Sequence, residues 1–105
     1  MTDYTFKPNF TTKIDFRQAK SPKTNNLTIV YVHGLYSDCW GRKPENILDW
    51  CQAHHLNFFR YELAGHGSDS ARYEEADLNI WKAQLLEAID ELVKTDVILA
   101  GSSVG

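Results

Sequence analysis

The end of the chain places a serine between two glycines, at a spacing suited to nucleophilic chemistry. Residues 97–105 read VILAGSSVG, so an apolar run leads directly into Gly101-x-Ser103-x-Gly105. This spacing is typical of a nucleophile elbow, a sharp turn between a strand and a helix that exposes the serine hydroxyl. The glycines matter because the turn is strained and crowded, so side chains two residues away would obstruct it. Ser103 is therefore the candidate nucleophile, and Ser102 is the alternative, which does not have glycine on both sides at this spacing.

The size and charge of the chain restrict the classes of protein to which it can belong. Its 105 residues predict at most one domain, and its net charge of −3 argues against a nucleic-acid binder. The N-terminus lacks the apolar core of a signal peptide, and the longest apolar run, Ile29–Val32, is too short to span a membrane. We therefore expect a cytoplasmic protein.

The cysteines give no sign of a disulfide or of a metal site. Cys39 and Cys51 are the only two, and free thiols are expected in a chain of this character. The sequence has no C-x-x-C pair, and neither cysteine has the set of neighbouring histidines that zinc requires. We expect neither a metal nor another cofactor.

Strands and helices are predicted to alternate along most of the chain. Runs of apolar and β-branched residues predict strands at 9–17, 27–32, 57–63 and 97–100. The run at 27–32 is continuous, which is typical of a strand buried on both faces of a parallel sheet. Helices are predicted from Pro44 to about His54 and, after an Asp77 cap, to about Lys94. Alternating strands and helices indicate an α/β protein with right-handed crossovers.

Side-chain spacing assigns the faces of both helices. In the first helix Ile47, Leu48 and Cys51 share one face, whereas His54 and His55 are expected at the surface near its end. The second helix carries an apolar stripe, formed by Leu78, Trp81, Leu85, Ala88, Ile89 and Leu92. The acidic residues before it are expected to be solvated; they are Asp69, Glu74 and Glu75.

Three motifs, each following a predicted strand, resemble those of the α/β-hydrolase superfamily. They are His33-Gly34-Leu35, Gly65-His66-Gly67-Ser68, and the Gly101–Gly105 elbow. The stretch from Val32 to Lys43, together with Trp81, is most similar to the acyl-protein thioesterase-like α/β-hydrolase-domain proteins. The resemblance covers about residues 27–105. It implies the N-terminal half of an α/β-hydrolase fold: a mainly parallel sheet with flanking helices.

The resemblance also implies roles for residues around the elbow. The backbone amides of Leu35 and Val104 are expected to form an oxyanion hole, which stabilises the negative charge of a tetrahedral intermediate. His33 is expected to orient its loop through hydrogen bonds. His66 is not expected to be the catalytic base, because in this fold the acid and the histidine follow the serine along the chain. Glu62, where relatives often carry aspartate, is interpreted as structural.

Two functional hypotheses follow from the position of the elbow at the end of the sequence. In the first, a longer parent protein is a serine hydrolase that cleaves a small-molecule or acyl-protein ester or thioester through an acyl-Ser103 intermediate. In the second, the chain is an inactive fragment or a binding remnant, because the acid and histidine of the triad are absent. The family's strand order would also leave 97–100 as an apolar edge and one face of the sheet uncovered.

Overall fold

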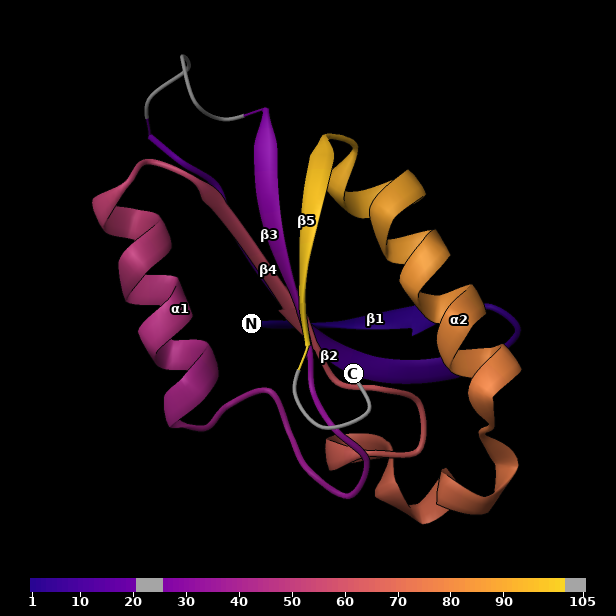
Figure 1. The fold of residues 1–105 in the computed structure, drawn as a ribbon. Coiled ribbons are helices and arrows are strands. Elements are labelled where there is room, and N and C mark those ends of the chain that lie inside the picture. Colours follow the sequence, from indigo (N-terminus) through magenta and orange to yellow (C-terminus); the bar gives the residue numbers. More distant parts are fainter. Residues whose placement is uncertain (21–25, 102–105) are drawn as a thin grey trace.

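A five-stranded mixed sheet forms the centre of the computed structural model, which describes residues 1–20 and 26–101 (Figure 1). The elements in chain order are β1 (Thr2–Phe6), β2 (Phe10–Arg17), β3 (Leu27–Val32), α1 (Arg42–Ala53), β4 (Asn57–Tyr61), the 3₁₀ helix η1 (Gly67–Glu75), α2 (Leu78–Glu87), the π-helical turn η2 (Ala88–Val93) and β5 (Asp96–Gly101). The α/β class expected from the sequence is confirmed.

The strand order β1-β2-β4-β3-β5 places β3 between two parallel neighbours. Ile29 pairs with Phe58 of β4 and with Ile98 of β5, and Val32 pairs with Gly101 at the end of β5. β1 and β2, by contrast, pair antiparallel with their neighbours. The carboxyl ends of β3, β4 and β5 therefore meet at one edge of the sheet, which we call the carboxyl edge.

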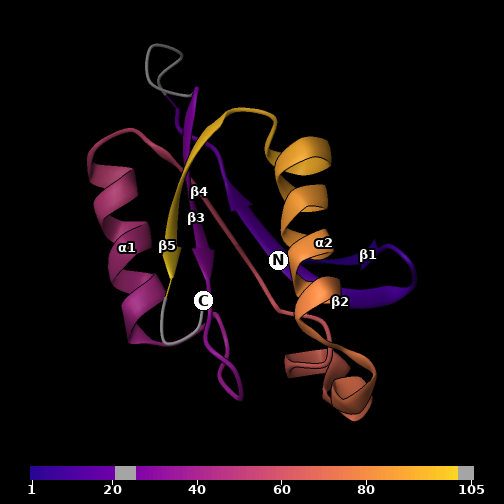
Figure 2. The same cartoon turned by 45° about the vertical axis from the view of Figure 1, so that its right-hand side comes forward.

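Each face of the sheet has its own apolar core under one helix (Figure 2). On the α1 side, Leu48 and Cys51 pack against a cluster that includes Phe58. On the α2 side, Ala88 and Val93 belong to a cluster with other core residues, namely Phe6, Val30, Phe59, Tyr61 and Leu63. Cys39 and Cys51 are buried free thiols, and burial raises the pKa of Cys51 to about 11.

Strand β1 is an element that the sequence did not predict. Its burial alternates only weakly, and Phe6 is its one buried residue. Tertiary contacts hold it in place, because Glu87 of α2 accepts hydrogen bonds from the Tyr4 hydroxyl (2.9 Å) and the Lys7 amide (3.0 Å). Because these contacts come from a helix about eighty residues away, the polar sequence of β1 itself contains no pattern that predicts a strand.

The helices agree with the sequence expectations except at single residues. The first helix begins at Arg42, two residues before the predicted start, and Pro44 is tolerated in the first turn, where amides have no intrahelical partner. The Asp77 cap is confirmed, because its carboxylate accepts from the Ile80 amide at 2.9 Å. Leu78, however, is 76% exposed and so does not belong to the buried stripe.

Strand β5 forms the sheet edge that the sequence predicted. Ile98 and Leu99 are both about half exposed although they point to opposite faces. The expectation that one whole face would be uncovered is wrong, because α1 and α2 lie on opposite faces of the central strands (Figures 1 and 2). Among residues 1–20 and 26–101, no helix is long and apolar enough to cross a membrane.

Gln84 joins α2 to the carboxyl edge through a fully buried side-chain amide. Its carbonyl oxygen accepts from the Ala64 amide at 2.9 Å, and its nitrogen donates to the Glu62 carbonyl at 2.9 Å. The same nitrogen lies 3.4 Å from the Thr12 hydroxyl. Gln84 therefore provides hydrogen-bond partners for two backbone groups just beyond the end of β4. Both groups belong to buried residues that water does not reach.

We predict that Gln84→Leu lowers the free energy of unfolding by about 2–4 kcal/mol, because two buried backbone groups lose their partners. Urea denaturation followed by circular dichroism measures the change. Gln52→Leu, on the exposed face of α1, is the matched control and should change stability by less than about 0.5 kcal/mol. Equal effects of the two substitutions would contradict the role of Gln84.

Candidate active site

A cavity of about 660 Å³ lies between the carboxyl edge and α2. Two of the site residues predicted from the sequence lie in its wall. Leu35 and Gly101 both line it, as the pairing of Val32 with Gly101 requires. Its other walls are largely apolar: Val32, Tyr61, Leu63, Leu78, Trp81, Leu85 and Leu99, with His33 and Lys82. The remaining elbow residues, Ser102, Ser103, Val104 and Gly105, lie outside the described residues.

His33 joins the loop after β3 to the loop after β4. Its Nδ1 lies 2.7 Å from the Gly34 carbonyl oxygen, and its Nε2 lies 3.0 Å from the Leu63 amide nitrogen. A carbonyl only accepts and an amide only donates, so the proton resides on Nδ1 and the ring is neutral. Burial lowers the pKa of His33, outweighing the Gly34 bond that favours the charged form. The predicted orienting role of His33 agrees with these contacts.

Glu62 organises the loop after β4 from the buried end of the strand. Its carboxylate accepts from the Lys13 amide (3.0 Å), the Ser68 hydroxyl (2.7 Å) and the Trp40 indole (3.3 Å). These donors come from β2, from η1 and from the segment before α1. The carboxylate is therefore a structural junction, as the sequence interpretation held, although the sequence alone did not reveal its partners.

The two glycines of the Gly65-His66-Gly67-Ser68 motif are explained by close backbone contacts. Both have positive φ, +76° at Gly65 and +56° at Gly67. A Cβ at Gly65 would lie 2.7 Å from the Tyr73 Cα, and a Cβ at Gly67 would overlap the Glu62 carboxylate. Neither position accepts a side chain, because both the backbone conformation and the space require glycine.

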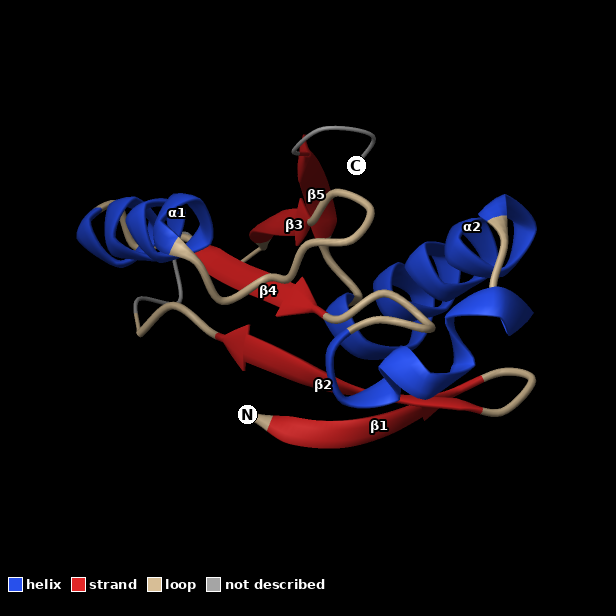
Figure 3. Ribbon diagram, turned by 90° about the horizontal axis from the view of Figure 1, so that it is seen from below, coloured by secondary structure: helices blue, strands red, loops and turns tan. Residues whose placement is uncertain are grey.

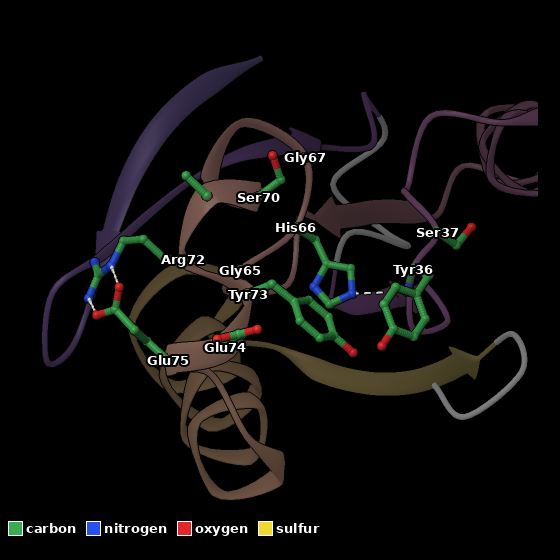
Figure 4. A pocket seen from close by; sticks show the side chains of 11 residues that line it. Tyr36, Ser37, Gly65, His66, Gly67, Ser70, Arg72, Tyr73, Glu74 and Glu75 are labelled. Atoms are coloured by element: carbon green, nitrogen blue, oxygen red, sulfur yellow. Dashed lines mark hydrogen bonds and ion pairs between the residues drawn. The ribbon is translucent and has the colours of Figure 1, made fainter.

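His66 lies between the two loops that flank the candidate site (Figure 4). Its Nε2 accepts from the Tyr36 amide at 3.1 Å, and its Nδ1 lies 3.1 Å from the Ala64 carbonyl oxygen. The ring is 4% exposed and forms edge contacts with the rings of His33 and Tyr73, at centroid distances of 5.1 and 5.2 Å. Both ring nitrogens are occupied, so His66 has no nitrogen free to act as a base, as expected.

A second hollow of about 680 Å³ opens beside His66 and is lined by Tyr36, Tyr73 and the polar residues of η1 (Figure 4). The two tyrosine rings stack at a centroid distance of 4.8 Å. Arg72 is not available there, because it pairs with Glu75 and donates to the Asn9 carbonyl. Of the acidic residues expected to be solvated, Asp69 instead accepts from the Gly65 amide at 2.8 Å.

Arg60 fixes the far end of the loop after β3. Its guanidinium is 5% exposed and pairs with the buried Asp15 at 2.9 Å, with Glu45, and with the Cys39 carbonyl. Burial by itself would raise the pKa of Asp15, but the hydrogen bonds from Arg17 and Arg60 hold it below its ordinary value. The loop is therefore held at His33, at Tyr36 and at Cys39.

The structure separates the four histidines into two groups. His33 and His66 lie at the carboxyl edge, whereas His54 and His55 follow α1 at the opposite end of the sheet and are exposed, as predicted. Sequence reasoning missed Gln84 and Trp40 as contributors to the site. The sequence offered one signal. Glu62 directly follows a buried strand, and a buried carboxylate needs hydrogen-bond donors nearby.

Curated proteins with similar sequences are thioesterases. The chain is 29% identical over 86 residues to rat palmitoyl-protein thioesterase ABHD10, mitochondrial, and 31% identical over 86 residues to the human protein of that name. These matches cover 82% of this chain but 29% and 28% of the relatives, so the chain spans less than a third of their length. No family model matches the chain.

The relatives contradict one expectation from the sequence. They are named as mitochondrial proteins, which points to mitochondria rather than to the cytoplasmic location that the composition suggested. Net charge and the absence of a recognisable signal peptide do not distinguish these two compartments, so they could not predict the location.

Solved structures show the same fold over nearly the whole chain. Mouse α/β hydrolase domain-containing protein 10 superposes with a TM-score of 0.83 at 22% identity, covering 99% of this chain and 40% of that one. A putative hydrolase from Agrobacterium vitis S4 also gives a TM-score of 0.83, at 21% identity, covering 100% of this chain and 40% of its own. The chain therefore has the fold of the N-terminal part of an α/β-hydrolase.

Proposed function

We propose that this chain provides the nucleophile and the oxyanion hole of a serine hydrolase that cleaves an acyl ester or thioester. One observation supports this most strongly: Val32 and Gly101 pair at the ends of adjacent parallel strands, and the segments that continue from them carry Leu35 and Ser103. Leu35 and Gly101 line the same apolar cavity. The names of the relatives favour a thioester as the substrate.

In the proposed reaction the Ser103 hydroxyl attacks the acyl carbonyl carbon and gives up its proton to a histidine base. The carbonyl oxygen takes the negative charge and accepts hydrogen bonds from the amides of Leu35 and Val104. Collapse of the intermediate expels the thiol or alcohol, and water then releases the acid from Ser103. Within residues 1–20 and 26–101, no group accepts a hydrogen bond from the Leu35 amide.

The base in this proposal is not one of the chain's own histidines. Both nitrogens of His33 and of His66 are engaged, and the other two histidines lie at the far end of the sheet. The proposal therefore requires a base from outside residues 1–105. We call "the complete hydrolase" the protein in which residues 1–105 are followed by the remaining elements of the fold, from its own reading frame or from mouse ABHD10.

A non-catalytic binding role is the second candidate. The half-exposed Ile98 and Leu99 on the β5 edge favour it, because unpaired apolar edges pair readily with other chains. The two candidates differ in whether a serine-directed probe reacts with Ser103.

We predict that a fluorophosphonate probe labels Ser103 in the complete hydrolase but not in the 105-residue chain, which lacks an activating base. Ser103→Ala should abolish labelling, whereas the neighbouring control Ser102→Ala should retain it. Peptide mass spectrometry identifies the modified serine. Strong labelling of the 105-residue chain would show that our account of the base is wrong, and an unreactive complete hydrolase would favour the binding role.

We predict that Leu35→Pro lowers kcat of the complete hydrolase by about 10²–10³-fold, because proline removes one oxyanion donor. The substitution suits the backbone: the Ser37 amide donates to the Gly34 carbonyl, and Tyr36 has a positive φ, so Leu35 occupies the second position of a type II turn. Proline is common at that position.

Leu35→Ala is the matched control for this experiment, since it removes the same side chain but keeps the amide. Because Leu35 also lines the cavity, we expect only that kcat of the alanine variant on an acyl thioester stays at least tenfold above that of the proline variant. Thermal unfolding should show both variants folded. Equal activity of the proline and alanine variants would exclude Leu35 as the donor.

A further inference from the structure

Tyr36 has a strained backbone conformation at the centre of the loop after β3. Its φ is +59°, a left-handed conformation that residues with a Cβ seldom adopt. Its side chain is 83% exposed, so burial in a core does not force the conformation. Strain of this kind persists only where surrounding contacts hold it, and such positions cluster at functional sites.

The strain belongs to the turn that carries Leu35. The Ser37 amide donates to the Gly34 carbonyl at 3.2 Å, which closes a four-residue turn with Leu35 and Tyr36 at its centre. Of the two central residues only Tyr36, the third residue of the turn, has a positive φ, which is the pattern of a type II turn. Rotation of the Leu35–Tyr36 peptide would give a type I turn, which removes the positive φ. Contacts of Tyr36 must therefore prevent this rotation, and one of them is the stack of its ring on Tyr73, at a centroid distance of 4.8 Å.

The contact that acts directly on the Leu35–Tyr36 peptide is the hydrogen bond from the Tyr36 amide to His66, at 3.1 Å. The Ala64 carbonyl accepts a hydrogen bond from the protonated Nδ1, so Nε2 carries no proton and accepts from the amide. The His66 ring is fixed by the rings of His33, Tyr73 and Trp81, at centroid distances of 5.1 to 5.9 Å. Figure 4 shows the His66 ring beside Tyr73, with the bond drawn toward the Tyr36 segment.

We propose that His66 is a positioning residue for the oxyanion hole. Its Nε2 holds the Leu35–Tyr36 peptide in the type II orientation and so fixes the carbonyl dipole of Leu35 next to the Leu35 amide. Rotation of that peptide would move the carbonyl oxygen and change the electrostatic environment that a developing oxyanion meets. This inference rests on the proposed function, because it gives His66 a purpose only if the Leu35 amide serves as a donor.

The test compares His66→Leu, which removes the acceptor, with His66→Gln, whose amide oxygen can occupy the place of Nε2. In the complete hydrolase we expect His66→Leu to lower kcat at least tenfold, but less than the loss of a donor, with KM on an acyl thioester nearly unchanged. His66→Gln should restore most of the rate. His54→Leu, an exposed histidine at the opposite end of the sheet, is the control and should match wild type.

A second measurement uses the 105-residue chain and does not depend on activity. Long-range ¹H–¹⁵N correlation spectra should show His66 with its proton on Nδ1, and the Tyr36 amide should exchange slowly with solvent. This measurement decides the case in which His66→Leu does not fold: an Nε2-protonated ring or a fast-exchanging Tyr36 amide overturns the proposal.

The two possible failures can be distinguished. A folded His66→Leu variant with wild-type kcat, in a hydrolase that labels at Ser103, contradicts the positioning role alone. A wild-type complete hydrolase that does not label contradicts the proposed function, and the role of His66 in catalysis is then excluded with it. Loss of kcat in His66→Leu with recovery in His66→Gln supports the proposal.

Discussion

The parallel pairing of β3 with both β4 and β5 is the constraint on which the site depends. Because parallel strands end at the same edge, the ends of three strands that are distant in sequence lie side by side (Figure 3). The loops after β3 and β4 begin at His33 and Glu62, and β5 ends at Gly101. This placement follows from strand order alone, before any side chain acts, and ligand sites of open α/β sheets generally lie at such an edge.

The loops at this edge are held by buried polar side chains rather than by apolar packing. His33, His66, Glu62 and Gln84 are each at most 4% exposed, and each bonds to a backbone group of another loop or strand. Such a network stabilises a structure only when its groups are satisfied, since an unpaired buried group costs more than a single bond contributes. It also fixes backbone directions, which apolar contacts do not. An edge that must present amide groups in defined orientations therefore benefits from polar rather than apolar supports.

The sequence predicted the parts of the fold that are encoded locally. Continuous apolar runs identified β3 and β5, and the Asp77 cap and glycine motifs marked the loops and helix starts correctly. Strand β1 could not be predicted, because Glu87 of α2 holds it. The partners of Glu62 and Gln84 were likewise invisible, since hydrogen bonds across loops leave no periodic pattern. At Leu78 helical periodicity predicted burial, but no described element covers that position.

The neutral state of the two buried histidines gives the edge a property that a catalytic site would need. Each ring donates from Nδ1 to a carbonyl and accepts at Nε2 from an amide, so protonation would place a donor against a donor. In an acyl transfer the proton from the serine must go to one particular base. Two nearby imidazoles that cannot accept it without breaking loop contacts do not compete for that proton. His33 and His66 therefore hold the backbone, and neither is available to move the proton in the proposed function.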